Sequence, residues 1–307
     1  MRIRSFSLAL IALLIITMFG CGAPRPAAGP TQSPFTSDLE NKFSQATALL
    51  YARIGSGTYI MVCTATAFER NEMVYHFVTA AHCVAEDNHD HRRVELAPVD
   101  WFISFDQRGT KNFIHAKILR AGYQSRGDDF AVLEVTLDKP VPVIPLASKD
   151  PSLGESVSNV ASPLGLGKQL FRGHVTMERL DRPIIDAGLN WRDTTLLQIN
   201  SGPGSSGSAI VSTSQSGITS ILVGRISNRG SENVVSIPVS KFQKFNQGVA
   251  DGKYPWYRAE TTASAEMTSN GQDAAAIARI LRRVQSHHSI IYKDFGPQLT
   301  LPTNEQE

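Results

Sequence analysis

Three short segments carry side chains that could take part in nucleophilic chemistry. His82 follows a run of small residues, Asp129 precedes the apolar run Phe-Ala-Val-Leu, and Ser206 lies within Gly-Ser-Ser-Gly-Ser. An imidazole takes up and returns a proton near neutral pH, and a hydroxyl becomes a strong nucleophile when a base removes its proton. Each segment alone has an ordinary structural interpretation as a packed histidine, a capped turn or a loop. Their joint occurrence, in the order His, Asp, Ser, is what favours a catalytic interpretation.

The segments that must position these side chains are short and rich in β-type residues. Between about residues 45 and 245, apolar runs alternate with turn signals, and few helical patterns interrupt them. This spacing predicts an all-β barrel or sandwich. The expected strands are Ala48–Ile54, Tyr59–Phe68, Val74–Thr79, Trp101–Phe105, Phe113–Leu119, Ala131–Val135, Ser156–Ala161, Leu170–Met177, Leu196–Ile199, Ala209–Val211, Ile218–Arg225 and Val234–Pro238.

The combined pattern resembles the chymotrypsin-like serine peptidases of the bacterial type. Thr-Ala-Ala-His-Cys at 79–83 matches the histidine motif of that family residue for residue. The segments at 129–133 and 204–208 are similar to its aspartate and serine motifs. The resemblance implies a double six-stranded β-barrel over residues 45–250, divided near 140–150, and a serine endopeptidase activity.

The resemblance also assigns a role to each of these side chains. His82 would be the base that takes the proton of Ser206 during attack on the substrate and returns it to the leaving amine. Asp129 would orient the imidazole and stabilise its protonated form, with the neighbouring Asp128 as the alternative. The backbone N–H groups of Gly204 and Ser206 would form an oxyanion hole.

Four further residues are assigned to the surroundings of the substrate. In the family, a serine after the nucleophile supports the triad aspartate, and its backbone pairs with the substrate strand; Ser227 takes this place by resemblance. The specificity pocket would include Asn200, Arg225 and Arg229. Because Asn200 at the expected pocket base is uncharged, nothing predicts cleavage after Lys or Arg, and the two arginines suggest acidic residues instead.

Two residues of the serine motif depart from the family. Ser205 stands where digestive relatives carry the Asp that pairs with a newly cleaved N-terminus, so we expect the site to form without such cleavage. Ser208 replaces the second Gly after the nucleophile.

The first 20 residues have the pattern of an export signal. Arg2 and Arg4 precede an apolar run at 6–19, which is short for a membrane span of about 20 residues. Cys21 then begins a tether, assigned to 21–44, in a context that resembles the lipobox of bacterial lipoproteins. We therefore expect an exported cell-envelope protein that is anchored to a membrane through lipidated Cys21; plain secretion and an uncleaved anchor are the alternatives.

Lipidation of Cys21 would leave two cysteines, Cys63 and Cys83, in an oxidising compartment. A disulfide between them is expected, and two buried free thiols are the alternative. The resemblance supports the bridge, because the family has a disulfide that joins the histidine turn to its neighbouring strand.

The charge balance bears on possible partners. The chain has 30 basic and 28 acidic residues, and two of the basic residues belong to the export signal. A neutral body gives no reason to expect nucleic acid as a partner, so protein or peptide substrates are expected. No cofactor is expected either, and the run with Asp87, His89, Asp90 and His91 is interpreted as a solvated loop rather than a metal site.

Residues 251–307 are expected to form a linker, a short helix at 273–285 and a polar tail. The helix would be a surface or docking helix, because its apolar residues recur at intervals of three and four; binding to a membrane surface is the alternative.

Two other functions compete with peptidase activity. A catalytically inactive pseudoprotease, acting as a binding or scaffold protein at the cell envelope, is the alternative. An α/β-hydrolase esterase is disfavoured, because Ser208 breaks its Gly-x-Ser-x-Gly pattern and its triad follows the order Ser, acid, His.

Overall fold

The computed structural model describes residues 37–251, except 55–57, 88–93, 97–98, 107–111, 125–126, 182–183, 187–188 and 229–230. Several expectations concern residues outside this part of the chain: the signal at 1–20, Cys21, His89, Asp90, His91, Arg229 and the helix at 273–285.

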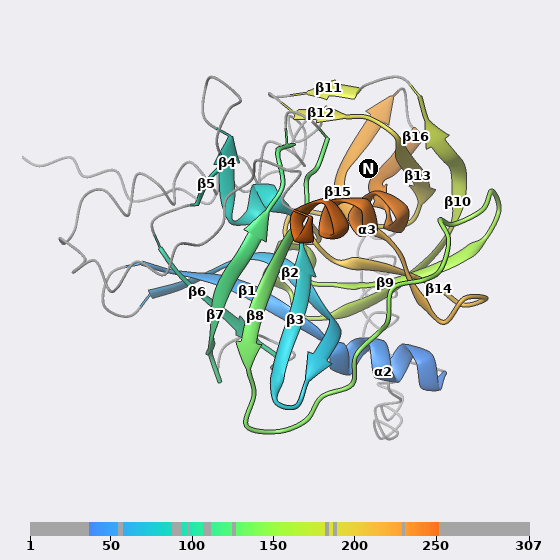
Figure 1. The fold of residues 1–307 in the computed structure, drawn as a ribbon. Helices are drawn as coiled ribbons and strands as arrows, with labels where there is room; N and C mark the ends of the chain where they lie inside the picture. The colour runs from blue at the N-terminus through green and yellow to red at the C-terminus, as the bar shows by residue number, and fades with distance from the viewer. Residues whose placement is uncertain are drawn as a thin grey trace, which may run out of the picture. The chain divides into compact units, whose positions relative to one another are not determined.

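Six antiparallel strands close into a first barrel in the order β1-β2-β3-β8-β7-β6 (Figure 1). Their bounds are β1 (Thr47–Ile54), β2 (Thr58–Asn71), β3 (Val74–Thr79), β6 (Asp100–Ser104), β7 (Ile114–Ala121) and β8 (Ala131–Thr136). In β7, Ala116 and Ile118 are buried whereas His115 and Lys117 are exposed, which is the two-residue period of a strand with one covered face. In β2, all residues from 62 to 68 are buried, as in a strand that is covered on both faces.

Six further strands close into a second barrel in the order β10-β13-β16-β15-β14-β9 (Figure 1). Their bounds are β9 (Ser156–Ala161), β10 (Gln169–Leu180), β13 (Thr194–Gln198), β14 (Ala209–Ser212), β15 (Gly217–Asn228) and β16 (Ser231–Pro238). Each expected strand overlaps one strand of the two barrels. The predicted double six-stranded β-barrel is therefore confirmed.

Helix α2 (Asp38–Ala46) precedes the first barrel and begins inside the segment that was expected to be a flexible tether. Ser37 caps this helix, because its Oγ accepts the N–H of Glu40 at 3.2 Å. The Ser-x-x-Glu spacing at 37–40 is a sequence signal for the start of a helix. It was missed because the whole of 21–44 was interpreted as a tether. The carboxylate of Glu40 accepts two hydrogen bonds from Arg172 of β10, at 2.7 and 2.8 Å.

Helix α3 (Val239–Ala250) follows the last strand, ahead of the helix that was expected at 273–285. Ser240 lies in the first turn of α3, and its N–H and hydroxyl donate hydrogen bonds to the carboxylate of Asp150 at 2.8 and 2.6 Å. Phe242 and Phe245 pack edge-on against Phe130, with ring centroids 5.3 and 4.6 Å apart. The helix therefore supports the start of β8.

The described part of the chain also contains two short hairpins and the 3-10 turns η1 and η3. The hairpins are β4 (Ala85–Asp87) with β5 (Val94–Leu96), and β11 (Ile184–Asp186) with β12 (Leu189–Trp191); the 3-10 turns are η1 (Ala81–Cys83) and η3 (Pro163–Gly165). Neither hairpin was expected from the sequence. Within the described residues, none of the helices has the length and apolar character that crossing a membrane requires.

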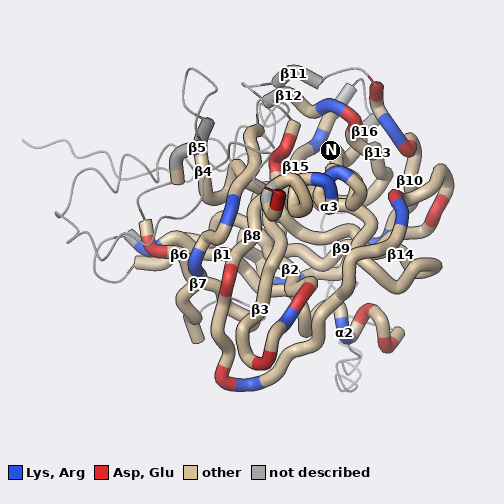
Figure 2. Tube along the Cα trace, in the orientation of Figure 1, with Lys and Arg blue, Asp and Glu red and all other residues tan. Residues whose placement is uncertain are grey.

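Charged residues of both signs are interspersed over the two barrels (Figure 2). Along β10, for example, Glu178 is followed by Arg179, whose guanidinium lies 2.6 Å from the carboxylate of Asp193. Such surface pairs contribute little to stability.

Candidate active site

His82 and Asp129 are brought together by the pairing of β3 with β8. Thr79, the last residue of β3, is paired with Ala131, the first residue of β8. His82 follows this pair within η1, and Asp129 precedes it, so both lie at the same end of the barrel. Both side chains are fully buried.

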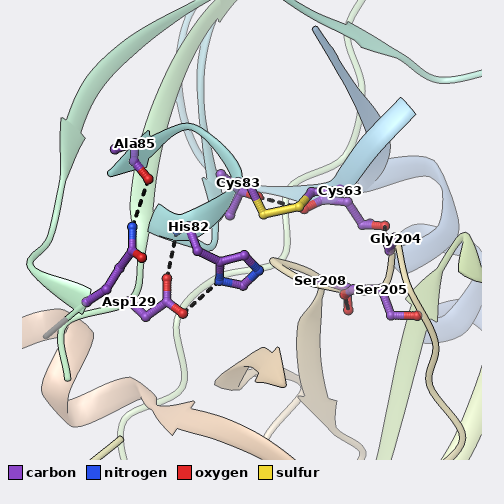
Figure 3. The surroundings of a disulfide bond; sticks show 11 residues. Cys63, His82, Cys83, Ala85, Asp129, Gly204, Ser205 and Ser208 are labelled. Carbon is purple, nitrogen blue, oxygen red and sulfur yellow. Dashed lines mark hydrogen bonds and ion pairs between the residues drawn. A yellow bond between two sulfur atoms is a disulfide. The ribbon is translucent and has the colours of Figure 1, made fainter. Parts of the chain in front are cut away.

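Both carboxylate oxygens of Asp129 accept hydrogen bonds from His82 (Figure 3). The ring Nδ1 lies 2.7 Å from Oδ2, and the backbone N–H donates to Oδ1 at 2.8 Å. Because an ionised carboxylate only accepts hydrogen bonds, Nδ1 carries the proton of the neutral ring and Nε2 carries the lone pair. The two contacts together hold the imidazole in one orientation.

A disulfide joins Cys63 of β2 to Cys83, the residue after His82, with 6.1 Å between the Cα atoms (Figure 3). The predicted bridge is therefore confirmed. The two sulfur atoms and a ring nitrogen of His82 lie within 4.8 Å of one another. Bridged sulfurs are not thiolates, however, and thiolates are what a metal ion would require.

Ser206 belongs to the glycine–serine turn, which we define as residues 202–208. Its side chain is fully buried, and its Oγ has no hydrogen-bond partner within the described part of the chain. Gly204 and Gly207 have positive φ angles of 93° and 80°. A Cβ atom on Gly207 would lie 2.1 Å from Oγ1 of Thr79, so this turn requires glycine both for its backbone angles and for its close packing.

The glycine–serine turn is bound to β2 beside the disulfide. Thr64 donates its N–H to the carbonyl of Ser206 at 2.9 Å and its Oγ1 to the carbonyl of Gly204 at 2.8 Å. Since Thr64 follows Cys63, which is bridged to Cys83, the same strand holds the turn that carries Ser206 and the turn that carries His82.

The segment 162–167 fixes the peptide plane between Pro203 and Gly204. The N–H of Leu164 donates to the carbonyl of Pro203 at 2.6 Å. In a trans peptide the carbonyl and the following N–H point in opposite directions, so the N–H of Gly204 points away from this segment. Leu164 is 58% exposed and has a positive φ of 56°, an unfavourable conformation that is typical of functional sites.

Ser227 lies near the tip of the β15–β16 hairpin, where its backbone is paired with Glu232. The residue of β15 that is bonded to the glycine–serine turn is Leu222, through Gly207 at 2.8 Å and Ser208 at 3.0 Å. Ser227 lies five positions beyond Leu222 along the strand, about 16 Å away. These contacts do not test the role assigned to Ser227, which stays a prediction.

The structure describes two of the three predicted pocket residues. Asn200 is exposed, two residues before the glycine–serine turn. The side chain of Arg225 is only 13% exposed, and its Nη1 lies 3.2 Å from the carboxylate of Glu232. Their contacts do not test a role in specificity, which stays a prediction.

Sequence reasoning missed Trp191, which is almost fully buried. A Cβ atom on Gly224 of β15 would lie 2.3 Å from its ring, so the indole covers the backbone of the strand just beyond Leu222. Nothing in the local sequence indicates this contact, because Trp191 reaches β15 from a separate hairpin.

Comparisons with known proteins agree with this geometry. Residues 63–218 match the family described as trypsin-like peptidase domain, whereas no curated protein matches the chain. The fold is similar to that of a serine-to-alanine mutant of Rv3671c from M. tuberculosis in its inactive form, with 14% identity and a TM-score of 0.52 over 75% of this chain and 98% of that one.

Two further solved structures are similar at 16% identity. The serine endoprotease from Yersinia pestis has a TM-score of 0.50 over 70% of this chain and 66% of that one. The HtrA-type protease AlgW has a TM-score of 0.51 over 70% of this chain and 63% of that one. At such identities the likeness shows the fold alone.

Proposed function

The chain belongs to the trypsin-like peptidase family and is a serine-type peptidase, and we propose that it hydrolyses peptide bonds through His82, Asp129 and Ser206. Ser206 Oγ attacks the substrate carbonyl carbon while its proton passes to Nε2 of His82. The C–N bond then breaks as this proton passes to the leaving amine. A water molecule then attacks the acyl carbon while its proton passes to Nε2 of His82. The bond between this carbon and Ser206 Oγ breaks as the proton passes from His82 to Oγ, which releases the acid and restores the serine.

The paired hydrogen bonds from His82 to Asp129 carry this proposal. They leave Nε2 as the basic atom of a neutral imidazole and place a negative charge where it stabilises the imidazolium. Asp129, rather than Asp128, accepts both bonds.

The N–H groups of Gly204 and Ser206 would stabilise the oxyanion of the tetrahedral intermediates. Leu164 supports this role for Gly204, because its bond to the carbonyl of Pro203 fixes the shared peptide plane. A substrate strand would pair with β15 beyond Leu222, because β14 pairs with β15 only up to Ile221 and the glycine–serine turn bonds Leu222.

Labelling with a fluorophosphonate and hydrolysis of fluorescein-casein test the proposal. We expect the wild type to be labelled and active, Ser206→Ala to be neither, and Asp129→Asn to lose about 10⁴-fold in kcat. If the folded wild type is not labelled and does not cleave casein, the inactive binding or scaffold protein is the better description.

We further propose that the chain is exported and lipidated at Cys21, on the pattern of its first 30 residues. Metabolic labelling with radioactive palmitate should mark the wild type and spare Cys21→Ser. Equal labelling of both proteins would contradict the proposal.

A further inference from the structure

Ser208 makes a contact that the glycine usual at its place could not make. Its Oγ donates to the carbonyl of Ser205 at 2.7 Å, and its backbone N–H donates to the same oxygen at 3.2 Å. The carbonyl of Ser205 shares a peptide plane with the N–H of Ser206. Because the two groups of a trans peptide point in opposite directions, the bond from Ser208 fixes the direction of the Ser206 N–H.

Asn159 of β9 holds the hydroxyl of Ser208 in turn. Its Nδ2 donates to Ser208 Oγ at 2.7 Å and to the carbonyl of Ala209 at 2.8 Å. Because the carbonyl of Ala209 can only accept a hydrogen bond, the atom of the Asn159 side chain that faces it must be the donor Nδ2, which fixes the orientation of this amide. With Nδ2 as its donor, Ser208 Oγ directs its own hydrogen to Ser205. All of these side chains are fully buried.

Ser205 adds a bond within the turn itself. Its Oγ accepts the N–H of Gly202 at 3.2 Å, and its own N–H donates to the carbonyl of Gly202 at 2.9 Å. Hydroxyl groups and an amide from β9 therefore help to hold this turn.

We propose that Asn159 and Ser208 are positioning residues that aim the N–H of Ser206 at the substrate oxyanion. This inference rests on the proposed function, and it gives the departure from glycine at 208 a role in catalysis. The network acts through Ser206 and does not touch the substrate. It should therefore affect the chemical step more than substrate binding.

The test compares Ser208→Ala and Asn159→Leu with the control Ser220→Ala. Ser220 is another fully buried serine of the same barrel, and its hydroxyl has no partner within the described residues. Removing an oxyanion donor costs about 10²- to 10³-fold in kcat, so we expect a loss of about 10- to 100-fold from misdirecting one. KM for fluorescein-casein should stay within about twofold, and the control should match the wild type.

Two further measurements separate positioning from general damage. Casein affinity, measured by anisotropy in the Ser206→Ala background, should not change when Ser208→Ala is added. The double variant of Asn159 and Ser208 should lose about as much kcat as the worse single variant, because both act through one bond.

The outcomes distinguish this inference from the proposed function. An active wild type with unchanged kcat in Ser208→Ala overturns the inference alone, as does a parallel loss of kcat and casein affinity. A wild type that is no more active than Ser206→Ala overturns the proposed function, and this inference with it.

Discussion

Thr64 donates its backbone N–H to the carbonyl of Ser206 at 2.9 Å, across the boundary between the two barrels. Its side chain donates to Gly204 at 2.8 Å. One residue of the first barrel thus holds the turn of the second barrel from which the proposed nucleophile and oxyanion hole come. The activity is therefore expected to depend on contacts between the barrels.

Thr64→Val should lower stability and kcat together. It keeps the backbone bond to Ser206 but leaves the buried carbonyl of Gly204 without its donor, which costs about 1–3 kcal/mol. Thr194→Val is the matched control, because Thr194 is buried and its Oγ1 has no partner among the described residues. Urea unfolding and casein hydrolysis measure both effects; equal stability of the two variants would contradict the role of Thr64.

Loss of the disulfide should destabilise the protein by about 3 kcal/mol, from the loop that it closes in the unfolded chain. Cys63→Ser should therefore unfold at a lower urea concentration than the wild type. A thiol titration of the unreduced, denatured wild type should find neither Cys63 nor Cys83, and reactive thiols at these positions would show that the bridge is absent.

Gly207→Ala should be far more damaging than Gly154→Ala. Both glycines have a left-handed backbone, with φ of 80° and 76°, so both variants pay about 1–2 kcal/mol for that conformation. A methyl group at 207 would also lie 2.6 Å from the carbonyl oxygen of Thr64, whereas nothing lies within 4 Å of one at 154. Thermal unfolding of the two variants compares them directly, and similar melting temperatures would contradict the close packing.

Stability should rise between about pH 8 and pH 10.5 because of Lys168. Burial lowers the pKa of its ammonium from 10.5 to about 8, although Asp106 opposes the shift. Below pH 8, Lys168 is protonated in both the folded and the unfolded chain. Between the two pKa values the unfolded chain binds more protons, so raising the pH favours the folded chain, by up to about 3 kcal/mol.

Urea unfolding across this pH range measures the contribution of Lys168. Lys168→Met should flatten the rise, whereas Lys117→Met, on the exposed face of β7, should keep it. A rise of the same size in both variants would mean that other groups cause it.

The local pattern of the chain was enough to predict the strands, and the resemblance of three short motifs to those of a known family indicated the proposed triad. The apolar runs and turn residues that indicate a strand lie within a few positions of one another. The bounds predicted for β3 and β9 are therefore those that the structure has. The motifs around His82 and Ser206 are equally local. Helix α2 was missed although its signal is local too, because a tether was inferred from the Pro and Gly residues before it.

Pairing across long stretches of chain was decided only in three dimensions. The bonds of Leu222 to Gly207 and Ser208 join β15 to the glycine–serine turn, and no local pattern indicates them. A local sequence pattern does not determine the register between two strands. In the folded chain, however, a shift of the register by one residue would break a row of buried hydrogen bonds. The contacts of Trp191 and Asn159 are also made with residues that are distant in the sequence. The sequence therefore did not predict these contacts, and only the tertiary structure shows them.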